Sequence, residues 1–191
     1  MPRNRAGTAR EEKIAQLLDA ADALFAEQGF AGTTTAQIAK KCAVSEKTLF
    51  WYFPSKDHIL VAVTERALRL VLHNLYVGGW PTGKPEKDLI AAIKALRDIR
   101  HLLTAAQQRA EVSPVVAKAR DQFREHNVRT LGNNLRALGA PPQKLGAWVT
   151  IMTCFIDGVL LRNMADGELE RVCRTLFASL APGAAKPQRV E

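Results

Sequence analysis

The chain has 191 residues, of which 47% are hydrophobic and 24% charged, a composition that supports a packed core and excludes wholesale disorder. Its formal net charge of +8 favours a polyanionic partner but does not identify one. The first ten residues lack the apolar stretch of a signal peptide. The most apolar window, residues 147–161, is shorter than the ~20 residues of a membrane span and contains Asp157. We therefore expect a soluble cytoplasmic protein without membrane contact.

The first part of the chain predicts four helices separated by start and stop signals. Residues 8–11 fit a capping box, and apolar residues follow at helical spacing until Gly29 ends the first helix. A second capping box, residues 34–37, opens a short helix. Ser45 is a good N-cap for a third short helix, and a longer fourth helix is predicted over residues 55–76.

The rest of the chain has helical periodicity and lacks the alternation typical of strands. After a loop at residues 78–81, helices are predicted over residues 86–109, 114–138, 143–165 and 168–181. Residues 104–112 either belong to the first of these helices or form a separate turn. The sequence thus predicts an all-α fold of about nine helices.

Two short helices, a tight turn and a longer helix before them make residues 34–53 a predicted helix-turn-helix. The second helix of such a unit enters the major groove of DNA by its N-terminal residues. The positions with core spacing are Val44, Leu49 and Phe53. Three neighbouring aromatic residues cannot all join that core and are left to contact DNA: Phe50, Trp51 and Tyr52. Trp51 has the alternative of packing against the first or the fourth helix.

The stretch GFAGTTTAQIAKKCAVSEKTLFWYFPSKDHIL, residues 29–60, resembles the TetR family of transcription regulators. The rest of the chain matches that family only in layout. Three positions depart from the pattern: Ala43 replaces the turn glycine, Lys47 a frequent glycine, and Phe50 the usual tyrosine. Ala43 predicts either a turn without positive φ or a mildly strained one.

The resemblance implies a sequence-specific DNA-binding transcriptional regulator. We expect a homodimeric repressor that a small-molecule effector releases from a palindromic operator in double-stranded DNA. The N-terminal arm and helix-turn-helix domain would occupy residues 1–54. A three-helix head of this kind would then be followed by a helical effector-binding and dimerisation domain over residues 55–191.

Two groups of DNA contacts are expected. The candidates for base contact are Glu46, which can accept from cytosine N4, Lys47, which can donate to guanine O6 or N7, and Phe50, which suits a thymine methyl. The positions that resemble phosphate contacts of the family are Thr35, Thr48, Tyr52 and Lys56. For Glu46 and Lys47 the alternative is a purely solvated pair. The leading segment is basic and suits the minor groove or the DNA backbone through Arg3, Arg5 and Arg10.

The last two predicted helices carry more apolar surface than one helical body needs. Residues 144–165 are apolar on nearly all faces, and the final helix has a continuous apolar stripe. These helices either complete an intramolecular core or pair with their copies, where Gly158 would permit close helix packing. We expect the dimer, because two DNA half-sites require two-fold symmetry. The interface candidates are Val159, Val172, Leu176 and Phe177.

An effector pocket is expected in the body. The helix over residues 114–138 carries polar residues on the face that also carries Val116 and Phe123. Polar groups on an inward face need partners, which are either neighbouring helices and water or a ligand. A few polar groups in an apolar wall are typical of small-molecule sites. The candidate residues are Gln107, Asn127, Thr130, Asn134, Trp148, Met152 and Phe155.

The sequence predicts no catalytic residue, metal site or cofactor, and the chain is expected not to be an enzyme. GGWPTGKP has Pro85 where a P-loop needs Ser or Thr, and a helix precedes it instead of a strand. No histidine pair has chelating spacing on one helix. The three cysteines lack a CxxC pair and are expected to be reduced and mostly buried, with a redox-sensing thiol as the alternative. The alternative function is a helical ligand-binding or adaptor protein with a degenerate helix-turn-helix.

Overall fold

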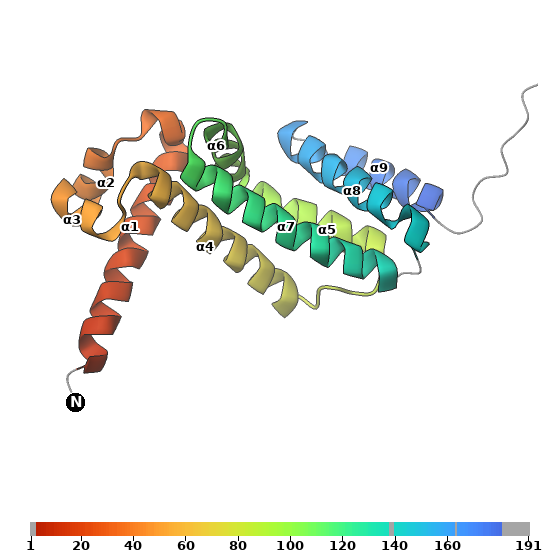
Figure 1. Cartoon of the computed structure of the whole chain (residues 1–191), viewed down its shortest axis with the longest axis horizontal. Helices are drawn as coiled ribbons and strands as arrows, with labels where there is room; N and C mark the ends of the chain where they lie inside the picture. The colour runs from red at the N-terminus through yellow and green to blue at the C-terminus, as the bar shows by residue number, and fades with distance from the viewer. Residues whose placement is uncertain (1–2, 138–139, 163, 181–191) are drawn as a thin grey trace, which may run out of the picture.

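The computed structural model describes residues 3–137, 140–162 and 164–180, and these ranges form nine helices and no strand (Figure 1). The helices are α1 Arg3–Gly32, α2 Thr35–Lys41, α3 Glu46–Tyr52, α4 Lys56–Val77, α5 Pro85–Arg97, α6 Arg100–Ala110, α7 Pro114–Ala137, α8 Pro142–Arg162 and α9 Asp166–Leu180. Within the described ranges, this confirms the all-α fold class and the expected number of helices.

The predicted start signals fix the ends of the short helices. Thr34 and Gln37 close a capping box, in which the backbone N–H of Thr34 donates to the Gln37 side chain at 2.7 Å. The hydroxyls of Ser45 and Ser55 each accept the backbone N–H three residues ahead. Gly29 has φ 75° and ψ 164°, so α1 kinks there before one further helical turn. The first helix therefore changes direction at the glycine that was expected to end it.

The predicted helix over residues 86–109 is two helices in the structure. α5 ends at Arg97, and Ile99 has the non-helical angles φ −107° and ψ 15° immediately before α6. Ile99 is buried and belongs to the same apolar cluster as Leu102, three residues further along in α6. Apolar spacing did not locate this break, because a change of helix direction leaves the spacing on both sides intact.

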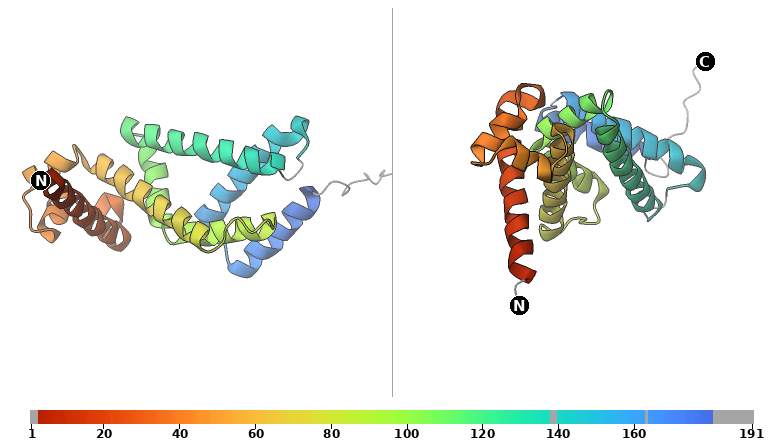
Figure 2. Two further views of the ribbon diagram at one scale, coloured as in Figure 1. Left: turned by 90° about the horizontal axis from the view of Figure 1, so that it is seen from below. Right: turned by 60° about the vertical axis from the view of Figure 1, so that its left-hand side comes forward.

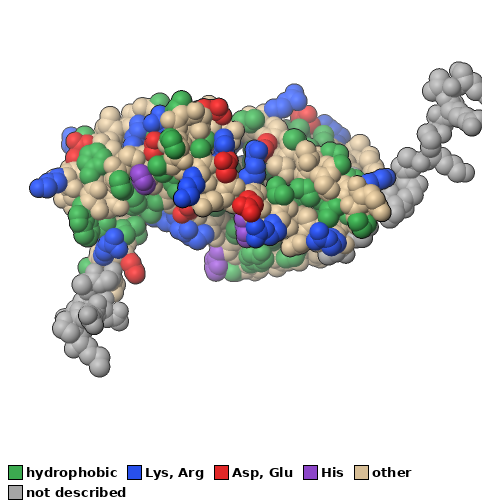
Figure 3. All heavy atoms as spheres, viewed as in Figure 1, with side chains coloured by type: hydrophobic (Ala, Val, Ile, Leu, Met, Phe, Trp, Pro, Cys, Tyr) green, Lys and Arg blue, Asp and Glu red, His purple; other side chains and the backbone are tan. Residues whose placement is uncertain are grey.

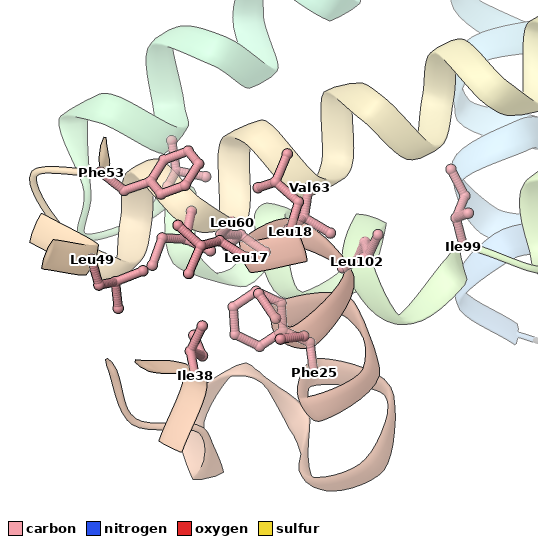
Figure 4. Packing of buried hydrophobic residues seen from close by; sticks show 14 of the residues in the cluster. Leu17, Leu18, Phe25, Ile38, Leu49, Phe53, Leu60, Val63, Ile99 and Leu102 are labelled. Atoms are coloured by element: carbon pink, nitrogen blue, oxygen red, sulfur yellow. The ribbon is translucent and has the colours of Figure 1, made fainter. Parts of the chain in front are cut away.

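The largest cluster of buried apolar side chains joins α1, α2 and α3 to the body. Figure 4 shows these side chains meeting from α1, α2, α4 and α6. The cluster includes Leu17, Phe25, Ile38, Leu49, Phe53, Leu60, Val63, Leu102 and Val116. The head formed by α1–α3 therefore shares its core with α4, α6 and α7. The domain boundary between residues 54 and 55 stays a prediction.

The body extends away from the head, with α8 and α9 at its far end (Figures 1 and 2). A second buried cluster joins α5, α8 and α9 around Ile93, Met152 and Leu169. A third joins α7 and α8 around Leu135 and Val149. α7 thus packs on α4 and α6 along one part of its length and on α8 along another.

Helix α8 has 21 residues and passes the length and composition test for a membrane span. This corrects the expectation that its apolar stretch is too short. Only 17% of its most apolar window is buried inside the chain. One such helix is weak evidence for a membrane, because helices that pack on other protein have the same composition. What the structure does establish is an apolar helix with much of its surface uncovered.

Candidate nucleic-acid interface

One side of helix α3 packs into the core of the head, and its other sides are mostly exposed to solvent. Leu49 is fully buried, and Val44 and Phe53 pack in the same cluster, which confirms the three predicted core positions. The exposed residues of α3 are Glu46, Lys47, Thr48, Phe50 and Trp51. The helix therefore presents a charged first turn and an aromatic second turn at the surface of the head.

The turn between α2 and α3 is strained at Ala43. Its φ is 53°, in the left-handed region that costs a residue with a Cβ about 1–2 kcal/mol. The turn is nevertheless held by the backbone N–H of Val44, which donates to the carbonyl of Ala39 at 3.0 Å. Of the two turns expected from the replacement of glycine, the structure has the strained one.

Two predicted DNA contacts are hydrogen-bonded to each other. The Thr35 hydroxyl donates to Oε1 of Glu46 at 2.6 Å. A hydroxyl has one hydrogen to donate, so in this arrangement Thr35 cannot also donate to a phosphate. Glu46 keeps its second oxygen as an acceptor. The hydroxyl of Thr48 lies 2.8 Å from that of Ser45, and either of the two can be the donor.

Trp51 is exposed, which settles an alternative that the sequence left open between DNA contact and packing on another helix. Its side chain is 68% exposed, so it does not pack into the core of the head. Tyr52 is half-buried and meets the Trp51 ring edge-on, with ring centres 4.7 Å apart. The guanidinium of Arg10 lies 5.5 Å from the same indole. The sequence could have indicated this exposure, because Trp51 is two residues away from both Leu49 and Phe53, and residues on one helix face are three or four apart. The side chains of Arg3 and Arg5 lie outside the described part.

The Lys56 ammonium, for which a phosphate contact was expected, is hydrogen-bonded within the protein. Nζ donates to the carbonyl oxygens of Phe30 at 2.9 Å and Thr33 at 2.7 Å. It also lies 4.3 Å from the centre of the Phe30 ring. The sequence placed this group on a phosphate because Lys56 begins a helix. Only the fold brings the end of α1 within its reach.

An ion pair next to Lys56 connects α4 with α6. Arg109 donates to both oxygens of Asp57, at 2.8 Å from Nε and 3.2 Å from Nη2. Burial opposes ionisation of Asp57, but hydrogen bonds from Arg109 and Ser113 outweigh it and lower the pKa of Asp57. Burial, followed by the charge of Arg109, lowers the pKa of Lys56. The start of α4 is thus fixed to both α1 and α6.

Charge is not concentrated on the head. Residues 1–56 contain eight basic and six acidic residues, so most of the positive balance lies in the rest of the chain. Figure 3 shows basic and acidic side chains interspersed over the face in view. The case for DNA binding therefore depends on the geometry of α2 and α3, and the overall charge adds little.

The predicted effector-pocket residues do not form one cluster. Met152 is almost fully buried in the second core, Trp148 packs against the third, and Phe155 lines a groove between α8 and α9. The others are exposed (Gln107, Asn127, Asn134) or half-buried (Thr130). The prediction assumed one continuous inward face on α7. Residues 124–129 of α7 are all exposed, so the helix has no continuous inward face between its packing on α4 and α6 and its packing on α8.

The α8–α9 surface differs in part from the expected dimer interface. Val159 is 1% exposed and belongs to the core shared with α5 and α9, so it cannot contact a partner without opening that core. Val172 and Leu176 do line an open groove of about 420 Å³ between α8 and α9. Phe177 is half-buried against the second core. Ile151 and Leu161 of α8 are exposed apolar residues that the sequence analysis did not assign to the interface.

A short helix pair at a tight turn, set on a longer helix and followed by a helical body, defines a helix-turn-helix protein. The profile of the bacterial regulatory proteins of the tetR family matches residues 17–63. Over 167 residues the chain is 30% identical to Mb2936c, an uncharacterized HTH-type transcriptional regulator of Mycobacterium bovis, in a match that covers 80% of this chain and 83% of that protein. The chain belongs to the TetR family of bacterial regulatory proteins.

Other relatives match mainly through the head or through the fold. The chain is 41% identical over 58 residues to the HTH-type transcriptional regulator HbdR of Aromatoleum sp., spanning 30% of this chain but only a quarter of HbdR. A transcriptional regulator from Rhodococcus sp. Rha1 has a similar structure, with a TM-score of 0.74 at 20% identity over 87% of this chain and 95% of that one. A regulator from Saccharomonospora viridis in complex with choline gives 0.72 at 17% identity, over 87% and 96%. At these identities the structural likeness concerns the fold.

Proposed function

We propose that the protein is a sequence-specific DNA-binding transcriptional regulator that acts in the cytoplasm. The observation that carries the proposal is helix α3, which is anchored by Leu49 and exposes Glu46, Lys47 and Phe50 from its first two turns. A carboxylate, an ammonium and an aromatic ring match a cytosine amine, a guanine edge and a thymine methyl in the major groove. Ser45 caps the helix at the end that would enter the groove.

Selection of bound duplexes from a random-sequence library tests this function, because it does not require the operator sequence to be known. Wild-type protein should enrich a palindromic sequence, and the Lys47→Ala variant should lose ~1–3 kcal/mol of preference at one base pair of each half-site. If the folded protein enriches no sequence, even at low salt, the regulator proposal is wrong. The result would favour an adaptor or ligand-binding protein with a degenerate helix-turn-helix.

A homodimer through α8 and α9 completes the proposal. It is supported by the apolar groove that Val172 and Leu176 line, and by Ile151 and Leu161 on the uncovered side of α8. A Cβ placed on Gly158 would meet no atom within 4 Å in the chain, which leaves room for a partner helix. Two heads related by a two-fold axis could then read the two halves of a palindrome.

The body is proposed to bind a small effector that releases a repressor from DNA. The same fold holds choline in the Saccharomonospora viridis regulator. In this chain the half-buried Thr130, Trp148 and Phe155 remain candidates for the pocket. A screen by thermal shift, followed by titration with and without the selected duplex, would test the idea. Effector and DNA must lower each other's affinity by the same factor; equal affinities in both titrations would remove the effector-release mechanism.

A further inference from the structure

The Lys56 side chain closes the C-terminal end of α1. Its ammonium donates to the carbonyls of Phe30 and Thr33 at 2.9 and 2.7 Å. Carbonyls at a helix C-terminus have no partner within the helix and carry the negative end of its dipole. Phe30 and Thr33 also bracket the last turn of α1, in which the Thr33 N–H donates to the Phe30 carbonyl at 3.3 Å. The Lys56 ammonium therefore gives the Phe30 carbonyl a second hydrogen bond and supplies one to the Thr33 carbonyl.

The Lys56 ammonium is partly enclosed by groups of the protein. An ammonium has three hydrogens to donate; two point at carbonyls, and the Phe30 ring centre lies 4.3 Å away. The guanidinium of Arg109 lies over the same ring at 5.8 Å, and Arg109 is itself fixed by Asp57. Without displacing these hydrogen bonds, a phosphate could accept only the third hydrogen of the Lys56 ammonium.

These contacts fix the link between α1 and α2. Thr33 is fully buried, its hydroxyl donates to the carbonyl of Gly29 at 2.9 Å, and α2 begins two residues later. Lys56 is the first residue of α4. The side chain thus joins the point where the chain enters the helix-turn-helix to the point where it leaves for the body.

We infer that Lys56 is a positioning residue of the DNA-binding head, which holds the α1–α2 link on α4 and makes no phosphate contact. The inference rests on the proposed DNA binding. It assigns to this lysine a role opposite to that expected from its place at a helix N-terminus. Since α2 carries Thr35, and Thr35 holds Glu46 of α3, a loosened link would misplace the recognition helix.

Salt dependence separates the two roles of a lysine. Each phosphate contact releases counterions and adds about 0.9 to the slope of log K against log salt. Binding of a fluorescent duplex of arbitrary sequence is measured over a range of salt for wild type, Lys56→Met and Lys47→Met. Lys56→Met should bind DNA about tenfold more weakly at every salt concentration. The two charge-assisted hydrogen bonds that hold the α1–α2 link are lost, so the link must be ordered when DNA binds. The slope of log K against log salt should stay unchanged. A slope reduced by about 0.9 would make Lys56 a phosphate contact, and unchanged affinity would make it merely structural; either result overturns the inference.

A second measurement does not depend on DNA. Amide hydrogen exchange of the free protein should be faster at residues 30–36 in Lys56→Met, while the exposed Lys47→Met control leaves it unchanged. If exchange there is unaltered, Lys56 does not hold the link and the inference fails. If wild type binds no duplex but the exchange changes as expected, the DNA-binding proposal fails while the place of Lys56 in the link stands.

A second variant is available if Lys56→Met does not fold. Phe30→Leu removes the aromatic ring and keeps the lysine, so it should weaken DNA binding and speed exchange in the same way but to a smaller extent. Unchanged DNA affinity and unchanged exchange in Phe30→Leu would also overturn the inference.

Discussion

The hydroxyl of Thr35 donates a 2.6 Å hydrogen bond to Oε1 of Glu46, joining the first turn of α2 to the first turn of α3. The two residues are 11 positions apart, and the sequence assigned them separate contacts, to a phosphate and to a base. The bond fixes one carboxylate oxygen and leaves the other free. Glu46 is thereby oriented before any DNA arrives, which reduces the entropy lost when it binds.

Thr35→Val should relax base preference more than it weakens binding. The valine keeps the shape of threonine but cannot hold Glu46, so the carboxylate loses its fixed direction. In a selection from random duplexes, preference at the base pair read by Glu46 should fall by up to the ~1–3 kcal/mol of one good base contact. Thr35→Ser is the matched control, since it keeps the hydroxyl. Equal loss of affinity for all sequences would instead identify Thr35 as a phosphate contact.

Ala43→Gly should stabilise the protein. Glycine adopts φ 53° without a Cβ clash, and relief of the strain should raise the free energy of unfolding by about 1 kcal/mol. Urea unfolding at fixed protein concentration measures the change. The control Ala23→Gly, at an exposed position inside α1, should lower stability by about 1 kcal/mol. If both substitutions destabilise equally, the turn is not strained.

Charge substitutions on α8 should separate dimerisation from folding. Leu161 is 63% exposed, so Leu161→Glu should give a folded monomer by light scattering and circular dichroism. Val159→Asp should unfold the chain, because it buries an unpaired carboxylate in the core with Leu169. A wild-type monomer at micromolar concentration would contradict the proposed interface.

The cysteines should differ sharply in reactivity. Burial raises the pKa of Cys173 to about 11, so roughly one thiol in a thousand is ionised at pH 8. Cys173 should react with a thiol reagent only after unfolding. Cys154, contrary to the expectation of mostly buried thiols, is exposed and has the helical spacing of Ile151 and Leu161. Its labelling should be faster in Leu161→Glu than in wild type; equal rates would place Cys154 outside the dimer interface.

The Asp57–Arg109 pair should stabilise the protein only above acidic pH. The folded-state pKa of Asp57 lies below its unfolded value. Its contribution is therefore complete above pH ~5 and is lost as the pH falls through the folded-state pKa. Asp57→Asn should lower the free energy of unfolding by about 1.5–3 kcal/mol at pH 7 and by much less at pH 3. The exposed control Asp98→Asn should show no such difference, and a cost for Asp57→Asn that is independent of pH would exclude the ion pair as its cause.

Local chemistry was enough to predict the head. Capping by Thr34, Ser45 and Ser55 acts within three residues, so the sequence determines those helix starts directly. The spacing of Val44, Leu49 and Phe53 likewise predicted which side of α3 is buried. Together with the long motif, these signals were sufficient for the fold class and the family.

Contacts between distant segments were decided only by the tertiary structure. Lys56 bonds to carbonyls of α1, Thr35 holds Glu46, and Val159 fills a core made with α5 and α9. Periodicity shows that a helix has a buried side but does not name what lies against it. For that reason it could not follow α7 as its neighbours change from α4 and α6 to α8. Helix positions and family follow from interactions a few residues apart, whereas the role of a polar side chain depends on which remote backbone the fold brings within about 3 Å of it.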